Sequence, residues 1–538
     1  MIVHDGGTVR DDAERDSGDG RAADDGSTSY DRAAPLPVPV PLPGAGDTIA
    51  ALATAIGRGA LAVIRVSGPD AYAVAARVLT PWKPEPRTTW LATLRDLSSG
   101  KVVDHPVVTA YAAPRSYTGE DLVELSVHGG ELVPVLALGA LLAAGAREAL
   151  PGEFTRRAVA NGKMDVLQAE GVGDLIDAQS RAMHDAAIGQ LEGSLSRRIA
   201  ALRDAVIGLE SLIAYDIDFP EEDDGPIPAE RVERGIADLE AALDALLATA
   251  ATGEMLRRGA LVVIAGAPNA GKSSLFNAIL GSTRAIVTDI PGTTRDAIEA
   301  VADVGSWPVR LVDTAGLRET SDVVERLGIE VSEQYLGDAD AVLACGETEE
   351  SLALTASRVR SLTRAPVLAV RTKADLVANR YQSPSEQLVA GSYQPATEDL
   401  VADCYQIAPV IGSADAAGDR VAEPRVAVSA ATGAGLGALA DTLARLLAER
   451  YGGVRGGSRS PVSDRSAPVL TRERHRVAVE RARGEVADFA RLWREGSLPA
   501  TVAAVHLHAA ATALESLIGG VDVEDVLDRI FSDFCVGK

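Results

Sequence analysis

The sequence Gly266-Ala-Pro-Asn-Ala-Gly-Lys-Ser273 lies between an apolar run at 261–265 and a helix-like apolar pattern at 274–280. A buried strand, the pattern GxxxxGK[ST] and a helix, in this order, are typical of a phosphate-binding loop. Glycines let the backbone wrap closely around phosphates, and the N–H groups of the loop and of the helix N-terminus face their negative charge. Lys272 is expected to reach the outer phosphates, and the Ser273 hydroxyl is expected to ligate Mg²⁺. A glycine-rich turn with a surface lysine is the alternative, and the full motif in this context makes it much the weaker interpretation.

Length and composition limit the class of protein. At 538 residues the chain is too long for one core, and a hydrophobic content of 46% is enough to build several domains. Acidic residues (77) outnumber basic ones (52), and the net charge of −25 argues against a protein that coats nucleic acid by bulk charge, while leaving room for a local basic patch. The cysteines Cys345, Cys404 and Cys535 are too widely spaced for a disulfide or zinc pattern, which fits a reducing cytosol. Without an apolar run of about 18 residues or a signal peptide, the protein is expected to be soluble and cytoplasmic.

The patterns along the chain predict a tail and three folded regions. Apolar residues recur every three or four positions from 188 to 213, which predicts one long helix. Strands are expected at 60–66, 107–111 and 122–127, and further helices at 132–142, 228–251, 471–494 and 500–518. Because helical patterns flank the nucleotide segment on both sides, an insertion into one helical domain is expected. The expected segments are a disordered tail at 1–46, an α+β domain at 47–163, a helical domain at 164–256, the nucleotide domain at 257–452 and the second helical part at 453–538.

Further motifs follow the phosphate-binding loop in a fixed order. An apolar run at 309–312 leads into Asp313-Thr-Ala-Gly316, where the aspartate can hold the Mg²⁺ shell and the glycine N–H can meet the γ-phosphate. The loop Thr288–Asp296 carries threonines that can complete the Mg²⁺ site and act as a switch. In Thr372-Lys-Ala-Asp375, the last residue can accept two hydrogen bonds from guanine N1 and N2, which selects GTP over ATP, and Ser429-Ala-Ala431 follows beside the base. Together these motifs predict a GTPase, whereas the short motifs Thr372–Asp375 or Ser429-Ala430 alone would not.

Two features leave the hydrolysis step incomplete. Many small GTPases carry a water-positioning glutamine directly after the DTAG glycine, but Leu317 stands there and cannot hydrogen-bond to water. In addition, no arginine finger is evident in the motifs of the domain. Other groups must therefore position the water and supply the missing positive charge.

Taken together, the motifs resemble the MnmE (TrmE) family of tRNA-modifying GTPases over about residues 47–538. The segments that carry the resemblance, besides the loops above, are Ser116-Tyr-Thr-Gly-Glu-Asp121, His128-Gly-Gly130, Pro151-Gly-Glu-Phe154, Asp313-Thr-Ala-Gly-Leu-Arg-Glu319 and Phe534-Cys-Val-Gly-Lys538. The resemblance implies an α+β N-terminal domain for folate binding and dimerisation, an all-α helical domain and an inserted, Ras-like α/β GTPase domain. It also implies a homodimer that forms a heterotetramer with the FAD-dependent partner MnmG (GidA), acts on tRNA and has no contact with a membrane.

The reaction implied by the resemblance joins GTP hydrolysis to tRNA chemistry. K⁺-dependent hydrolysis would drive dimerisation of the GTPase domains and a conformational change. The complex would add an aminomethyl or carboxymethylaminomethyl group to C5 of the wobble uridine of certain tRNAs. A formyl- or methylene-tetrahydrofolate would donate the one-carbon unit.

The resemblance also implies roles for matching positions of this chain. K⁺, in the place of an arginine finger, would bind Asn269, Thr288, Ile290 and Thr293. Mg²⁺ would bind Ser273 and Thr294, and the folate would contact Arg65, Glu124, Lys163 and Lys538. The catalytic residues would be Lys272 and Glu325, and Glu325 would orient the attacking water indirectly. Cys535 matches the family's terminal cysteine, with a chemical role and a packed thiol as the two alternatives. GTP contacts are implied for Asn269, Ala270, Gly271, Lys272, Ser273, Ser274, Thr288, Asp289, Ile290, Pro291, Gly292, Thr293, Thr294, Asp313, Thr314, Ala315, Gly316, Thr372, Lys373, Ala374, Asp375, Ser429, Ala430 and Ala431.

Departures and alternatives stand beside this resemblance. Thr372 stands where asparagine is usual. A threonine offers one hydroxyl in place of the two polar groups of an amide, which predicts weaker guanine binding. The polar segment at 377–423 is expected to be a flexible insertion. On strand pattern alone, Arg65 and Glu124 would face solvent, as charged residues in strands usually do. A regulatory GTPase that binds RNA or ribosomes as an assembly factor would share the nucleotide motifs, as would a helical scaffold whose GTPase only controls dimer opening. The terminal Cys-Val-Gly-Lys and the folate-type residues favour the modifying enzyme.

Overall fold

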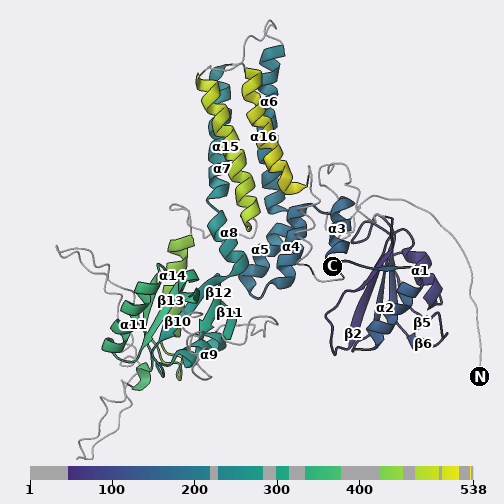
Figure 1. The fold of residues 1–538 in the computed structure, drawn as a ribbon, viewed down its shortest axis with the longest axis horizontal. Coiled ribbons are helices and arrows are strands. Elements are labelled where there is room, and N and C mark those ends of the chain that lie inside the picture. Colours follow the sequence, from purple (N-terminus) through teal and green to yellow (C-terminus); the bar gives the residue numbers. More distant parts are fainter. Residues whose placement is uncertain are drawn as a thin grey trace, which may run out of the picture. The chain divides into compact units, whose positions relative to one another are not determined.

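The computed structural model describes residues 46–218, 228–282, 298–313, 334–376, 425–451, 467–495 and 500–519, together with Phe534 and Gly537. The sheets and helices form α+β, all-α and α/β parts, which confirms the predicted fold class (Figure 1). The predicted tail, apart from its last residue, and the predicted insertion at 377–423 lie outside the described residues. Within the described ranges, no helix is long and apolar enough to cross a membrane.

The first part of the chain is a six-stranded sheet with helices packed on one face. The strand order is β4-β7-β8-β2-β1-β9, and all neighbours are antiparallel except β1 and β9. The strands are β1 (Ile49–Leu52), β2 (Leu61–Ser67), β4 (Thr89–Leu91), β7 (Val107–Tyr111), β8 (Leu122–His128) and β9 (Arg147–Glu148), and a smaller sheet holds β3 (Leu79–Thr80), β5 (Thr93–Arg95) and β6 (Val102–Asp104). Alternate residues of β2 and β8, such as Ile64 and Leu125, pack with helices α1 (Ala71–Val78) and α2 (Val133–Ala143). This alternation leaves the charged residues of both strands on the opposite face.

The all-α part joins helices from both sides of the nucleotide segment. Its helices are α4 (Val166–Asp177), α5 (Arg181–Leu191), α6 (Ser194–Asp218), α7 (Ala229–Leu247), α8 (Ala250–Arg258), α15 (Glu473–Glu495) and α16 (Ala500–Ile518), and α3 (Glu153–Ala160) precedes them. α6, α7, α15 and α16 lie side by side (Figure 1) and share one apolar core, to which Val206, Leu243 and Phe489 contribute. The apolar stripes predicted from helical spacing therefore pack helix on helix.

Two predicted helices are each divided in the structure, so those predictions were wrong. The pattern at 188–213 crosses from α5 to α6 at Gly193, whose φ of 78° is left-handed and ends a helix at low cost. The pattern at 228–251 crosses from α7 to α8 at Thr249. The Thr249 hydroxyl donates to Leu246 O at 2.6 Å and accepts from the N–H of Leu470 at 3.2 Å, which fixes the break. Apolar spacing continues through both breaks because consecutive helices bury neighbouring faces.

The nucleotide segment is a twisted α/β sheet. Its strand order is β11-β12-β10-β13-β14-β15, parallel except for the antiparallel β11–β12 pair. The elements are β10 (Ala260–Gly266), α9 (Lys272–Ser282), β11 (Ile298–Val304), β12 (Trp307–Asp313), β13 (Ala341–Gly346), α11 (Glu349–Leu362), β14 (Val367–Arg371), β15 (Arg425–Ala427) and α14 (Leu436–Tyr451). Later strands lie on both sides of β10, so the strand order reverses there. Ligands of open α/β sheets bind at the carboxyl ends of strands at such a point.

Candidate functional site

The phosphate-binding loop lies at the carboxyl end of β10, as predicted. A Cβ added to Gly266 would lie 2.7 Å from the carbonyl oxygen of Cys345, so only glycine permits this approach of β10 and β13. Gly271 has a φ of 80° and Asn269 a φ of 64°, both in the left-handed region. The Lys272 ammonium donates to the carbonyls of Gly266 at 3.0 Å and Ala267 at 2.9 Å, and therefore lies over the loop itself.

A hydroxyl and a carboxylate meet beside this loop. Ser273 Oγ, in the first turn of α9, donates to Asp313 Oδ2 at 2.6 Å, and the Asp313 side chain at the end of β12 is buried. Mg²⁺ prefers oxygen ligands, and at nucleotide sites one or two protein oxygens share it with phosphates and water. The Ser273–Asp313 pair fits that requirement. Among the described residues, no cluster of three or more histidine, cysteine or acidic side chains could hold a metal ion.

The thiol next to the loop has a packing role. Cys345 is fully buried in β13, opposite Gly266. Burial raises the pKa of the Cys345 thiol to about 12, so it stays protonated at neutral pH. Its observed contacts are those of a side chain that packs the loop against the sheet.

The two base-recognition motifs meet because β14 and β15 are neighbours. Ser429 Oγ donates to Asp375 Oδ1 at 2.7 Å and thereby orients the carboxylate. The Lys373 ammonium donates to the carbonyl of Asn269 at 3.0 Å and pairs with Glu347, and the Thr372 hydroxyl donates to the carbonyl of Ala270. The base motif and the phosphate loop are therefore joined by direct hydrogen bonds. Ala374, Ala430 and Ala431 follow these residues in the same two loops, and Ser274 lies next to Ser273 in α9.

Several predicted site residues lie outside the described residues. They are Thr288, Asp289, Ile290, Pro291, Gly292, Thr293, Thr294, Thr314, Ala315, Gly316, Glu325, Cys535 and Lys538, together with Leu317 and Cys404. Their assignments stay predictions.

A second site is centred on two charged residues of the N-terminal sheet. Arg65 of β2 and Glu124 of β8 stand opposite each other in the register, and Arg65 Nη2 lies 2.8 Å from Glu124 Oε1. Their side chains lie on the sheet face away from helices α1 and α2 and are 16% and 25% exposed, so they are partly shielded from solvent rather than fully exposed. The Arg65 guanidinium also lies over the rings of Tyr117 at 5.0 Å and Phe154 at 5.6 Å. Both rings belong to the segments that carried the family resemblance, although their contact with Arg65 was not predicted.

Lys163 contacts a different part of the N-terminal domain from the Arg65–Glu124 pair. Its ammonium donates to the carbonyl of Pro114 at 3.1 Å on the surface. Gly119, at a φ of 79°, passes close to it, since an added Cβ would lie 3.3 Å from Lys163 Cγ. Lys163 is thus held beside the loop between β7 and β8.

A buried ionic network behind this site was missed by sequence reasoning. The Arg157 side chain of α3 is 2% exposed and donates to Glu120 at 3.2 Å, to Glu153 at 3.0 Å and to the carbonyl of Asp47 at 2.8 Å. Burial opposes ionisation of Glu153, yet hydrogen bonds from Arg147, from the Leu150 N–H and from Arg157 keep its pKa below the usual value. The network fastens α3 to the loop before β8. Glu120 and Glu153 lie in segments that carry the family resemblance, which was the available signal. Their shared partner Arg157 is four residues from Glu153 but 37 from Glu120, and that longer contact has no sequence pattern.

The described part of the C-terminus contacts both neighbouring regions. Phe534 packs with Val166 and Ala169 of α4. Gly537 has a φ of 99°, and an added Cβ would lie 2.2 Å from the carbonyl oxygen of Leu52 in β1. The end of the chain is thereby held against the strand that pairs with β2, the strand of Arg65.

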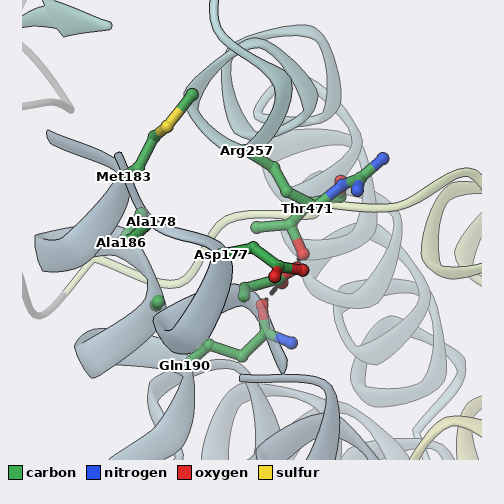
Figure 2. Close-up of a pocket in the computed structure, with 9 residues that line it drawn as sticks. Asp177, Ala178, Met183, Ala186, Gln190, Arg257 and Thr471 are labelled. Carbon is green, nitrogen blue, oxygen red and sulfur yellow. Dashed lines mark hydrogen bonds between the residues drawn. The ribbon is translucent and has the colours of Figure 1, made fainter. Parts of the chain in front are cut away.

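A cavity of about 70 Å³ with a mixed polar and apolar lining lies among α4, α5, α8 and the residues before α15 (Figure 2). Its wall includes Asp174, Asp177, Gln190, Arg257 and Thr471. The Thr471 hydroxyl donates to Gln190 Oε1 at 2.9 Å, and Arg257 Nε donates to the Thr471 carbonyl at 3.1 Å. A water molecule needs roughly 10–15 Å³ of this volume, so the cavity has room for a few waters.

A glycine-rich loop of the phosphate-binding type, a serine–aspartate hydrogen bond beside it and an aspartate oriented by Ser429 lie on one α/β sheet, an arrangement typical of phosphate-loop GTP hydrolases. Comparisons with known proteins narrow this class. A family model described as "MnmE helical domain" matches residues 166–535, and one described as "GTP-binding protein TrmE N-terminus" matches residues 48–163. The chain belongs to the MnmE family of tRNA modification GTPases.

Individual relatives agree with this assignment. The tRNA modification GTPase MnmE of Moorella thermoacetica is 42% identical over 502 residues, covering 91% of this chain and 99% of the relative. The protein of the same name from Heliobacterium modesticaldum is 39% identical over 500 residues, with 92% and 100% covered. That of Methylorubrum populi is 40% identical over 501 residues, with 91% and 98% covered. Among solved structures, the G domain of the T. maritima FeoB iron transporter aligns with 35% of this chain and 97% of its own at 23% identity and a TM-score of 0.22, which is too low to bear on the assignment.

Proposed function

We propose that this GTPase, with an FAD-dependent MnmG-type partner, adds an aminomethyl or carboxymethylaminomethyl group to C5 of the wobble uridine of certain tRNAs. A tetrahydrofolate derivative would supply the one-carbon unit. One observation carries the proposal: a single chain of this family holds a nucleotide site at Ser273 and Asp313 and a separate, partly buried Arg65–Glu124 pair. A GTPase that only regulated assembly would have no use for the second site.

The chain's own groups can divide the work of GTP hydrolysis. Lys272 and the N–H groups of the loop would hold the β- and γ-phosphates, and Ser273 with Thr294 would hold Mg²⁺. Asn269, whose backbone carbonyl is fixed by Lys373 at 3.0 Å, stands exposed on the loop, where its amide oxygen suits a monovalent cation. K⁺ and Mg²⁺, when bound, would neutralise the charge that develops between the β- and γ-phosphates.

Residues outside the described ranges complete the proposal for hydrolysis. Thr288, Ile290 and Thr293 would supply further oxygens to K⁺, and the loop that carries them would order when two GTPase domains meet. Glu325 would orient the attacking water through a second water, because a carboxylate in direct contact would repel the γ-phosphate. Leu317 leaves that task to another residue, which motivates the assignment.

The Arg65–Glu124 pair has unused hydrogen-bonding capacity that suits a pterin. Glu124 Oε1 accepts from Arg65 Nε at 3.0 Å and Nη2 at 2.8 Å, whereas within the described part of the chain Oε2 receives only the Tyr111 hydroxyl at 3.4 Å. Glu124 Oε2 can therefore accept from the N–H groups of a pterin ring, and the Tyr117 ring offers an apolar wall. Lys163 and Lys538 would pair with the carboxylates of the folate tail.

The remaining parts of the proposal concern partners and place. The chain would act as a homodimer through its N-terminal domain, with limits at 47–163 for that domain and 257–452 for the GTPase domain. GTP hydrolysis would drive pairing of two GTPase domains and a conformational change in the heterotetramer. A tRNA substrate places the reaction in the cytoplasm. Cys535 would lie near the folate, with a chemical role or a packing role.

The test is reconstitution of the tRNA reaction. The purified chain, the FAD-dependent partner, unmodified tRNA, GTP, methylene-tetrahydrofolate and glycine, which supplies the amino nitrogen, are incubated in KCl or in NaCl of equal concentration. The tRNA is then digested and its nucleosides are weighed by mass spectrometry. C5-substituted uridine is expected in KCl, much less in NaCl and none without GTP. GTP hydrolysis with no change in the tRNA would overturn the proposal and favour an assembly factor.

A further inference from the structure

The hydroxyl of Thr372 donates its proton to the phosphate-binding loop. Thr372 directly follows β14, its side chain is 3% exposed, and its N–H donates to the carbonyl of Gly346 at 2.9 Å. Its Oγ1 donates to the carbonyl of Ala270 at 2.7 Å, with Gly346 O a second acceptor at 3.3 Å. The next loop residue, Gly271, passes so close that an added Cβ would lie 3.4 Å from Thr372 Cβ. The residue is therefore a tie between the base motif and the loop.

This tie leaves Thr372 without a donor for a base. A hydroxyl carries one proton, whereas an amide such as that of asparagine carries two. Guanine N7 is an acceptor and needs a donor. Because both carbonyl partners of Thr372 belong to the protein, its single proton stays within the protein.

The other polar side chains of the base motifs also contact groups of the protein. The Lys373 ammonium contacts Asn269 O and Glu347, and Ser429 Oγ donates to Asp375 Oδ1 at 2.7 Å. Asp375, as an ionised carboxylate, can only accept, which suits guanine N1–H and N2–H. The backbone N–H groups at 430 and 431 make no hydrogen bond within the described ranges, and they can donate to guanine O6. No side-chain donor among residues 372, 373, 375 and 429 is directed by these contacts to N7.

We propose that Thr372 is a positioning residue that ties the base motif to the phosphate loop, and that the site binds guanine without a hydrogen bond to N7. This rests on the guanine site of the proposed function and adds to it which edge of the base is recognised. Nucleotide affinity then depends on N1 and N2 through Asp375 and is indifferent to the atom at position 7 of the base.

The test compares GDP with 7-deaza-GDP, in which a C–H group replaces N7, and with ADP. Dissociation constants are measured by calorimetry on the full chain and on Thr372→Asn, Thr372→Val and Thr372→Ser. The dissociation constants of the wild type for GDP and 7-deaza-GDP are expected to agree within about twofold. The reason is that the wild type makes no hydrogen bond to N7, so removal of N7 costs no affinity. Thr372→Asn should prefer GDP by up to about tenfold, the effect of one hydrogen bond.

The remaining variants separate the tie from general structural damage. Thr372→Val, which keeps the shape and removes the hydroxyl, should weaken GDP and 7-deaza-GDP by the same factor, about three- to tenfold. Thr372→Ser keeps the hydroxyl and should bind GDP and 7-deaza-GDP as tightly as the wild type. Wild-type binding of 7-deaza-GDP that is tenfold weaker than that of GDP would overturn the inference, as would a valine variant that changes their ratio. Equal binding of ADP and GDP would instead overturn the guanine site itself.

Discussion

Replacing Glu170 by Gln tests the ionic cluster that joins the two halves of the helical domain. Glu170 lies on α4 and is 0% exposed. It accepts from Arg474 Nε at 2.6 Å and from His475 Nε2 at 2.7 Å, both at the start of α15. Since an ionised carboxylate only accepts, His475 carries its proton on Nε2. Thus the segment that follows the GTPase domain is anchored to a helix that precedes it.

The magnitude follows from the titration of Glu170. Burial alone would raise its pKa, but the hydrogen bonds from His475 and Arg474 lower the pKa to about 2, from an ordinary value of 4.5. At 1.36 kcal/mol per pH unit, this difference corresponds to about 3 kcal/mol of folding stability at neutral pH. Loss of one partner of a buried pair costs roughly 3–5 kcal/mol, which agrees. Glu170→Gln should therefore lower the free energy of unfolding of the helical domain by about 3 kcal/mol.

Acid should have the same effect in two stages. Burial lowers the pKa of His475, so the unfolded chain takes up a proton that the folded chain does not, and stability falls as the pH drops below about 6.5. The depressed pKa of Glu170 gives stability that is complete above about 4.5 and is lost as the pH falls towards 2. Glu170→Gln should abolish the second stage.

A fluorescence assay can isolate this domain. Of the four tryptophans, Trp493 lies on α15, with its ring 6.1 Å from that of Phe489. In a background in which Trp82, Trp90 and Trp307 are replaced by Phe, urea unfolding followed by fluorescence reports on the helical domain alone.

The matched control is Glu480→Gln on the same helix. Glu480 is 47% exposed and pairs with Arg476, so its loss should change stability by less than about 0.5 kcal/mol. A Glu170→Gln chain that unfolds at the same urea concentration as Glu480→Gln would refute the reasoning.

Three further results are expected. Arg65→Ala and Glu124→Ala should each weaken reduced-folate binding by roughly tenfold or more in titrations of the full chain, and unchanged affinity would disprove that site. Gly537→Ala, whose Cβ would lie 2.2 Å from Leu52 O, should displace the chain end and weaken folate binding at a constant rate of GTP hydrolysis; equal folate binding would speak against this contact. Asn269→Ala should lose up to roughly 10³-fold in kcat in KCl, and a wild type equally fast in KCl and NaCl would contradict the K⁺ site.

The nucleotide site was largely predictable from sequence because its motifs fix local geometry. The spacing from Gly266 to Ser273 allows one kind of loop, and the later motifs were expected to lie beside the base. The hydrogen bond between Asp375 and Ser429 across neighbouring strands was not predicted. The folate-type pair was predicted by resemblance. Strand alternation indicated the correct face of the sheet for it but not its partial burial. Whether a charged residue in a strand faces water depends on the opposite strand, which a single segment does not reveal.

Other features depend on contacts that sequence patterns do not record. Glu170 and His475 are separated by 305 positions, and neither stands in a motif. The break at Gly193 was missed because apolar spacing continues across it, although a glycine between helical patterns was a visible signal. The use of the Thr372 hydroxyl required the position of Ala270, since a threonine can donate to a loop or to a base.

The most direct measurement of the central claim is the hydrolysis of GTP and xanthosine triphosphate by the wild type and by Asp375→Asn. Ser429 can donate to the Oδ1 of either side chain, so the substitution keeps the shape and changes an acceptor into a donor. The account predicts that kcat/KM for GTP falls by roughly 10²-fold, the effect of two hydrogen bonds to a charged group, and that xanthosine triphosphate becomes the better substrate. A variant that hydrolyses GTP at the wild-type rate, or a wild type that hydrolyses ATP as well as GTP, would contradict it.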